Sequence, residues 1–209
     1  MARPRSDIRP RVIEAARVRY LKDGVDGASL RGIATEAGTS IGMIYYYFKT
    51  KDDLFLGVVE DVYVGLLEDI SAIAEDDSPA DERIRRLYAR LGRMSDIEFE
   101  TIAIVVREAL ISSSRLESLM GRFSQGHLPL IVKLLHDGVQ QGVITDRHPL
   151  PLMMVSMGAV GILPQMIRRL IARDSPLLLN LLPEGEILAK MLAEVILHGI
   201  AKGERGDDE

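Results

Sequence analysis

Residues 29–51, SLRGIATEAGTSIGMIYYYFKTK, constrain the fold more than any other segment of this chain. Ala34 is small enough for a second helix to cross close to the first, and Gly38 can adopt the positive φ that ends a helix and opens a turn. Ile44 offers an apolar side chain with which the second helix packs on its neighbours. This spacing predicts a helix-turn-helix, whose second helix enters the major groove of DNA.

Charge is divided unevenly along the 209 residues. Residues 1–51 carry ten Lys and Arg against five Asp and Glu, a net charge of +5, whereas residues 52–209 carry a net charge of −10. A basic segment on an acidic body is expected where only the first quarter of the chain contacts phosphate. A chance division of charge is the alternative interpretation.

Several classes of site are excluded or disfavoured. The chain has no Cys, so disulfides, thiolate metal sites and cysteine nucleophiles are excluded. Its four His form no HExxH motif, and neither a phosphate-binding glycine loop nor a G-x-S-x-G motif occurs. We therefore expect no metal, no cofactor and no enzymatic activity. The start, MARPRSDIRPR, lacks the apolar segment of a signal peptide, which favours a cytoplasmic protein.

The periodicity of apolar residues predicts an all-α protein. Ser29 is expected to cap the second helix, Thr39 or Ser40 the third, and Thr50 with Asp53 a fourth. Pro79 is expected at the first position of a helix, and Ser114 with Glu117 in a further capping box. Pro129 is expected to kink or divide the run that follows. Helices are predicted at about 7–23, 79–94, 97–112, 150–173 and 184–202.

The uncharged stretch 149–167, PLPLMMVSMGAVGILPQMI, allows two interpretations. Its length and hydropathy fit a membrane span. Its three prolines, its glutamine and its small residues (Ser156, Gly158, Ala159, Gly161) favour close helix packing instead. We expect a buried or subunit-interface helix and no membrane partner.

The run IATEAGTSIGMIYYYFKTKDDLF resembles the amino-terminal domain of the TetR family of transcriptional regulators. The resemblance is specific across residues 8–60, and beyond them only length and helical pattern agree. It implies a three-helix helix-turn-helix DNA-binding domain at 1–51 and a helical ligand-binding and dimerisation domain at 52–209. It also implies a homodimer through the last two long helices. The expected function is a repressor that binds a palindromic operator and is released by a small, largely apolar inducer; activation stays open.

Carried over by matching position, ten residues are expected to contact DNA. Gly42 would let the recognition helix lie close to base edges, tyrosine hydroxyls suit the DNA backbone, and Lys51 matches a phosphate contact. Arg3, Arg5 and Arg9 either follow phosphate or form a solvated basic tail. For Tyr47, packing beside Phe48 is an equal alternative, and for Met43 packing is also open. The candidates are Ser29, Arg31, Thr39, Ser40, Gly42, Met43, Tyr45, Tyr46, Tyr47 and Lys51.

Wide apolar helix stripes and nine Met suggest an adaptable ligand cavity in the second domain. Arg107 and Glu108 interrupt an apolar helix, either facing a pocket or, as we expect, lying at the surface. Ordinary core packing is the alternative for each lining candidate. The candidates are Met94, Phe99, Ile102, Met120, Phe123, His127, Met153 and Met157.

Two other functions fit parts of the sequence. A helical ligand-binding or scaffold protein would keep every function after loss of Tyr45 and Lys51. A membrane-associated protein using residues 149–167 would need detergent for solubility.

Overall fold

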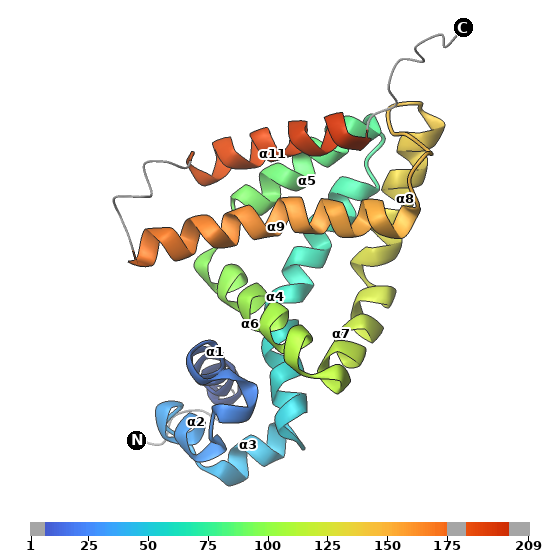
Figure 1. Cartoon of the computed structure of the whole chain (residues 1–209). Helices are drawn as coiled ribbons and strands as arrows, with labels where there is room; N and C mark the ends of the chain where they lie inside the picture. Colours follow the sequence, from blue (N-terminus) through green and yellow to red (C-terminus); the bar gives the residue numbers. More distant parts are fainter. Residues whose placement is uncertain (1–6, 175–182, 201–209) are drawn as a thin grey trace, which may run out of the picture. The chain divides into compact units, whose positions relative to one another are not determined.

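The structure is a computed structural model that describes residues 7–174 and 183–200, and ten helices and no strand occur within these ranges (Figure 1). The predicted all-α class is confirmed. Arg3, Arg5 and the polar tail lie outside the described residues. The helices are α1 (Ile8–Gly27), α2 (Leu30–Glu36), α3 (Ile41–Tyr47), α4 (Lys51–Ala74), α5 (Ala80–Gly92), α6 (Asp96–Ile111), α7 (Ser113–Gln125), α8 (His127–Gln140), α9 (Leu150–Asp174) and α11 (Gly185–Ile200).

The chain folds into two compact units, and neither of them is one continuous segment. The first unit comprises residues 1–66 and 95–123, and the second comprises residues 67–94 and 124–209. Helix α4 contributes its first part to the first unit and its last part to the second. These units group helices by packing, and the division of functions at residue 51 stays a prediction.

The first unit is built around α1, whose apolar side chains meet α2, α3, α4 and α6. Tyr20, Ile33 and Ile44 are buried here together with Phe55. Helices α6 and α7 complete this core with Ile104 and Leu119, which lie far from the helix-turn-helix in sequence. The helix-turn-helix therefore rests on a core that α6 and α7 share.

The second unit packs α5 against α8, α9 and α11. Tyr88 of α5 is buried and donates its hydroxyl to the main-chain oxygen of Met157 in α9, at 3.0 Å. Arg83, also buried, donates to Asp137 of α8 at 3.0 Å and to the carbonyl of Ala74 at 2.8 Å. These bonds satisfy polar groups that would be costly to bury alone.

Helix α9 has one buried face and one exposed apolar face. Met153, Met157 and Gln165 are buried, whereas Leu152, Val155, Leu163 and Ile167 are exposed along the opposite side. Within the described residues, Leu150–Arg169 is the one helical stretch whose length and composition would allow it to cross a membrane, which is weak evidence by itself.

Several helix ends differ from the sequence-based expectations. Helix α7 begins at Ser113, and Arg115 donates its main-chain N–H to the hydroxyl of Ser112 at 3.4 Å, so the capping box predicted at Ser114 is wrong. Pro79 precedes α5 as its N-cap instead of opening it. The helical segment that contains Pro129 is divided at Gly126, whose backbone angles are non-helical. Pro129 itself lies in the first turn of α8.

Candidate DNA-binding interface

The turn between α2 and α3 forms as the sequence predicts. Ser29 caps α2 by accepting from the N–H of Gly32 at 3.0 Å, and Ser40, not Thr39, caps α3 by accepting from Met43 at 3.3 Å. Gly38 has a φ of +60°, where a side chain would be strained. The N–H of Thr39 then donates to the carbonyl of Ala34 at 2.9 Å, which closes the turn.

Helix α3 turns one face to the core and another to solvent. Ile44 is buried, whereas Tyr45 and Tyr46 expose 48% and 70% of their surface. None of the ten DNA-contact candidates is buried: Ser29, Arg31, Ser40, Gly42, Tyr45 and Tyr46 are exposed, and Thr39, Met43, Tyr47 and Lys51 are half-buried. The geometry leaves all ten accessible, and their contacts with DNA stay predictions.

The aromatic residues at the end of α3 divide between packing and exposure. Phe48 is buried, and the guanidinium of Arg9 lies 5.8 Å from the centre of its ring. Tyr47 is half-buried against the same core, with its ring edge-on to Tyr46 at 5.1 Å between centroids. Tyr47 therefore packs against the core, which is one of the two interpretations of this residue, and part of its ring is still accessible.

Two arginines of α1 contact the carboxyl end of α2, next to the turn, and the sequence analysis predicted neither contact. Arg11 donates to the carbonyl of Ala37 at 2.6 Å, which satisfies the carboxyl end of α2. Arg19 pairs with Glu36 of α2 at 2.6 Å. The net charge of +5 over residues 1–51 therefore includes arginines that stabilise the fold through contacts within the chain.

The first turn of α4 follows the predicted capping box. Thr50 Oγ1 accepts from the N–H of Asp53 at 3.0 Å, and the carboxylate of Asp53 accepts from the N–H of Thr50 at 2.9 Å. Lys51 Nζ donates to the main-chain oxygen of Asp26 at 2.9 Å, and Tyr20 donates its hydroxyl to the carbonyl of Lys51 at 3.5 Å. Burial raises the pKa of Tyr20, so this phenol stays protonated and able to donate.

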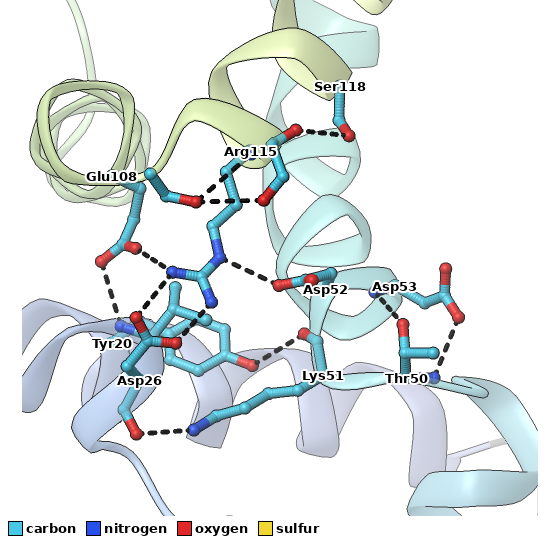
Figure 2. Close-up of polar contacts among 12 residues, drawn as sticks. Tyr20, Asp26, Thr50, Lys51, Asp52, Asp53, Glu108, Arg115 and Ser118 are labelled. Carbon is cyan, nitrogen blue, oxygen red and sulfur yellow. Dashed lines mark hydrogen bonds and ion pairs between the residues drawn. The ribbon is translucent and has the colours of Figure 1, made fainter.

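A cluster of charges around Arg115 of α7 joins four segments of the first unit (Figure 2). The guanidinium pairs with Asp26 at 2.5 Å, with Asp52 at 2.9 Å and with Glu108 at 2.7 Å. Glu108 of α6 is fully buried, and its second oxygen accepts from the N–H of Val25 at 3.0 Å. The hydrogen bond with Arg115 lowers the pKa of Asp26, and the carboxylates, Asp26 first, raise the pKa of Arg115.

The expectation that Arg107 and Glu108 both lie at the surface is wrong for Glu108. Arg107 is exposed, whereas Glu108 points into the first unit, where a carboxylate needs partners to be buried at all. The sequence signal for this site was an acidic residue inside the apolar run AIVVREAL. The same signal could not name Arg115, which lies on the next helix.

The eight ligand-lining candidates fall into both units. Met94, His127, Met153 and Met157 belong to the second unit, where the three methionines are buried and burial lowers the pKa of His127. Phe99, Ile102, Met120 and Phe123 belong to the first unit, where the Phe123 ring lies 5.6 Å from that of Tyr63 and Met120 is exposed. Their role in a shared pocket stays a prediction.

An open hollow of about 580 Å³ lies beside the turn of the helix-turn-helix. Its walls come from α1, the α2–α3 turn and α4, and they include Arg11, Glu36, Gly38 and Asp61. None of the eight ligand-lining candidates contributes to it. Its charged rim is unlike the apolar cavity that the sequence suggested.

Comparison with known proteins agrees with this geometry. Residues 12–58 match the family described as "Bacterial regulatory proteins, tetR family". The HTH-type transcriptional repressor SCO4008 of Streptomyces coelicolor is 27% identical over 175 residues, which cover 81% of this chain and 86% of that protein. Over residues 12–58 the chain therefore matches the TetR family.

Solved structures of TetR-type architecture match nearly the whole chain. FadR from Bacillus subtilis, in complex with stearoyl-CoA, has a TM-score of 0.69 at 20% identity and covers 91% of this chain and 98% of that one. The ketosteroid transcriptional regulator KstR2 of Mycobacterium tuberculosis has a TM-score of 0.68 at 17% identity, with 97% and 98% covered. At these identities the likeness shows the fold, and the TetR family itself is one of DNA-binding, non-enzymatic transcriptional regulators.

The variant Gly42→Ala separates an effect on stability from an effect on the expected DNA contact. An added Cβ would lie 3.7 Å from Ser40 Oγ, an ordinary contact, so the melting temperature should rise by the equivalent of about 0.5–1 kcal/mol. DNA affinity should nevertheless fall by about 1–3 kcal/mol, because the methyl group holds α3 away from base edges. Thermal unfolding and fluorescence anisotropy with a selected duplex measure the two effects.

Gly65→Ala is the matched control, because Gly65 lies exposed on α4 with nothing within 4 Å of an added Cβ. It should stabilise the fold similarly and leave DNA affinity unchanged. If Gly42→Ala bound DNA as tightly as this control, Gly42 would not face the groove.

Proposed function

We propose that this protein is a TetR-family repressor that binds a palindromic operator as a homodimer in the cytoplasm and is released by a small, largely apolar ligand. The observation that carries the proposal is the exposed face of α3, where Gly42, Tyr45 and Tyr46 are accessible while Ile44 anchors the helix. In a dimer, two such helices would enter successive major grooves about 34–36 Å apart. Residues 1–51 would then contact DNA, and residues 52–209 would bind the ligand and form the dimer.

The apolar sides of α9 and α11 support a homodimer through these two long helices. Leu152, Val155, Leu163 and Ile167 follow helical spacing on the exposed side of α9. Ile187, Met191 and Val195 do the same on α11, which packs beside α9 in the second unit. Exposed apolar side chains that line two packed helices favour an interaction site, and a second copy would bury them symmetrically.

Two observations support an apolar ligand. Met94, Met153 and Met157 are buried in the second unit, and methionine adapts its shape to a bound apolar group. Among structures of the same fold, FadR of Bacillus subtilis binds stearoyl-CoA, and the name of KstR2 refers to ketosteroids. A ligand would release DNA only if it bound the non-DNA conformation more tightly than the DNA-bound one.

Selection of binding sites from a random duplex pool at two salt concentrations tests the proposal. We expect an inverted repeat with half-sites one helical turn apart, about 10 base pairs. Weak binding that enriches no sequence and disappears at moderate salt would contradict it. That result would favour a ligand-binding or scaffold protein, whose functions would survive the loss of both Tyr45 and Lys51. The selected duplex then serves as the probe in a ligand-release screen.

Lys51→Ala should weaken binding to all DNA sequences alike. Lys51 Nζ uses one of its three donors on the carbonyl of Asp26, and the others can bind phosphate. The plot of log affinity against log salt should become shallower by about one unit, as expected for one lost phosphate contact. Lys190→Ala, at an exposed position of α11, should leave the slope unchanged. Altered base preference with an unchanged slope would overturn the phosphate assignment.

Val155→Glu should separate the dimer. Val155 exposes 69% of its surface in one protomer, and an unpaired carboxylate there would be buried between two copies. The dimer dissociation constant should rise by about a hundredfold, measured by analytical ultracentrifugation, and operator affinity should fall with it. Val64→Glu, at a half-exposed apolar position of α4, is the control. A wild-type protein that is monomeric, or soluble only with detergent, would contradict this interface.

A further inference from the structure

One guanidinium contacts both ends of the helix-turn-helix. The segment from α2 to α3 begins just after Asp26 and ends just before Asp52, and the side chain of Arg115 pairs with both carboxylates, at 2.5 and 2.9 Å. Lys51 Nζ, the expected phosphate contact, also donates to the main-chain oxygen of Asp26 at 2.9 Å, separately from Arg115. Figure 2 shows the carboxylates of Asp26 and Asp52 both joined to Arg115, which lies in the first turn of α7. The two ends of the DNA-contacting segment are therefore held from one point.

The side chain of Arg115 is itself held in place by a buried ion pair with Glu108. Arg115 has 9% of its side chain exposed and Glu108 has none, and the two are joined at 2.7 Å. Glu108 also accepts from the N–H of Val25 at 3.0 Å, so the buried carboxylate is satisfied on both oxygens. A buried, hydrogen-bonded ion pair with fixed geometry holds its outer partners more firmly than a solvated pair does. Asp26 and Asp52, by contrast, are mostly exposed, at 76% and 58%.

We propose that Arg115 is a positioning residue for DNA binding, which fixes the separation of Asp26 and Asp52 and thereby the presentation of α3, without contacting DNA itself. This inference rests on the proposed function. It places the junction of α6 and α7 in control of the helix-turn-helix, because a shift of Arg115 against Glu108 would move both ends of the segment together. A conformational change at the junction of α6 and α7 would therefore alter DNA affinity.

Substitution of Asp26 and Asp52 tests the proposal, because a charge effect and a positioning effect predict opposite changes in DNA affinity. If Asp26 and Asp52 act only through their charge, Asp26→Ala and Asp52→Ala should bind DNA more tightly, because each removes a negative charge near phosphate. If they hold the helix-turn-helix, each should lower operator affinity by about two- to fivefold, the range for exposed ion pairs. Affinity for a random duplex should not fall, so the ratio of specific to non-specific binding decreases.

Asp61→Ala is the matched control. Asp61 is an exposed carboxylate of the same helix as Asp52, and it has no ion pair with any residue in the described part of the chain. It reports the effect of charge alone. The proposal is overturned if Asp26→Ala and Asp52→Ala bind the operator as tightly as Asp61→Ala, or more tightly.

The guanidinium itself is tested in a variant that keeps the fold. Arg115→Met alone would leave Glu108 buried without its partner, a costly change. The double variant Glu108→Gln with Arg115→Met removes both charges, and the Gln oxygen can still accept from the N–H of Val25. We expect a folded protein with the same loss of specific affinity. The control is Arg122→Met, on α7 like Arg115, whose exposed partner is Glu60 of α4, and it should bind like wild type.

Hydrogen exchange of the free protein supplies a readout that needs no operator. Amides of residues 28–50 should exchange faster in Asp26→Ala and Asp52→Ala than in Asp61→Ala, because the ends of the segment are released. Unchanged exchange would overturn the positioning role, whether or not an operator is found. Failure of wild type to select any operator would overturn the proposed function instead, so the two failures are distinguishable.

Discussion

The buried ion pair of Glu108 and Arg115 is the interaction on which the arrangement of the first unit depends. A carboxylate with no exposed surface has to be paired and hydrogen-bonded, and α1, through Val25, supplies the second partner. Because Arg115 also pairs with Asp26 and Asp52, helices α6 and α7 are joined to α1 and α4 by ion pairs as well as by packing. Directional charge contacts thus add to the apolar packing in specifying one position of these helices.

The local features of the helix-turn-helix could be predicted from the sequence because each depends on neighbouring residues. The positive φ of Gly38, the caps by Ser29 and Ser40, and the capping box at Thr50 all involve residues within three or four positions of each other. The same logic failed at α7. There three consecutive serines offer competing caps, and the helix begins at Ser113, two residues before Arg115 with its buried partner Glu108.

Long-range features could not be predicted, because nothing in a helical pattern says which helices pair. The contact of Arg115 with Asp26 spans 89 positions of sequence, and Glu108 looked like a surface residue in the helical pattern. The apolar run of α9 was equally ambiguous from hydropathy. The structure separates it into a buried face with Met153 and Met157 and an exposed face with Val155. Which side chains surround a ligand depends on such pairings and stays a prediction.

The composition of the first unit has a consequence for how regulators of this kind can exchange DNA specificity. Residues 95–123 lie after the first segment of the second unit, yet they complete the core under α1 with Ile104 and Leu119. A recombinant joined at residue 51 would carry the recognition helix without these partners. A helix-turn-helix taken from this chain should therefore keep its core only if α6 and α7 are transferred with it, or if the recipient supplies equivalent apolar residues together with the arginine and the buried carboxylate. Exchange of the amino-terminal segment between such chains is therefore limited by its packing against residues 95–123, and not by the short recognition helix.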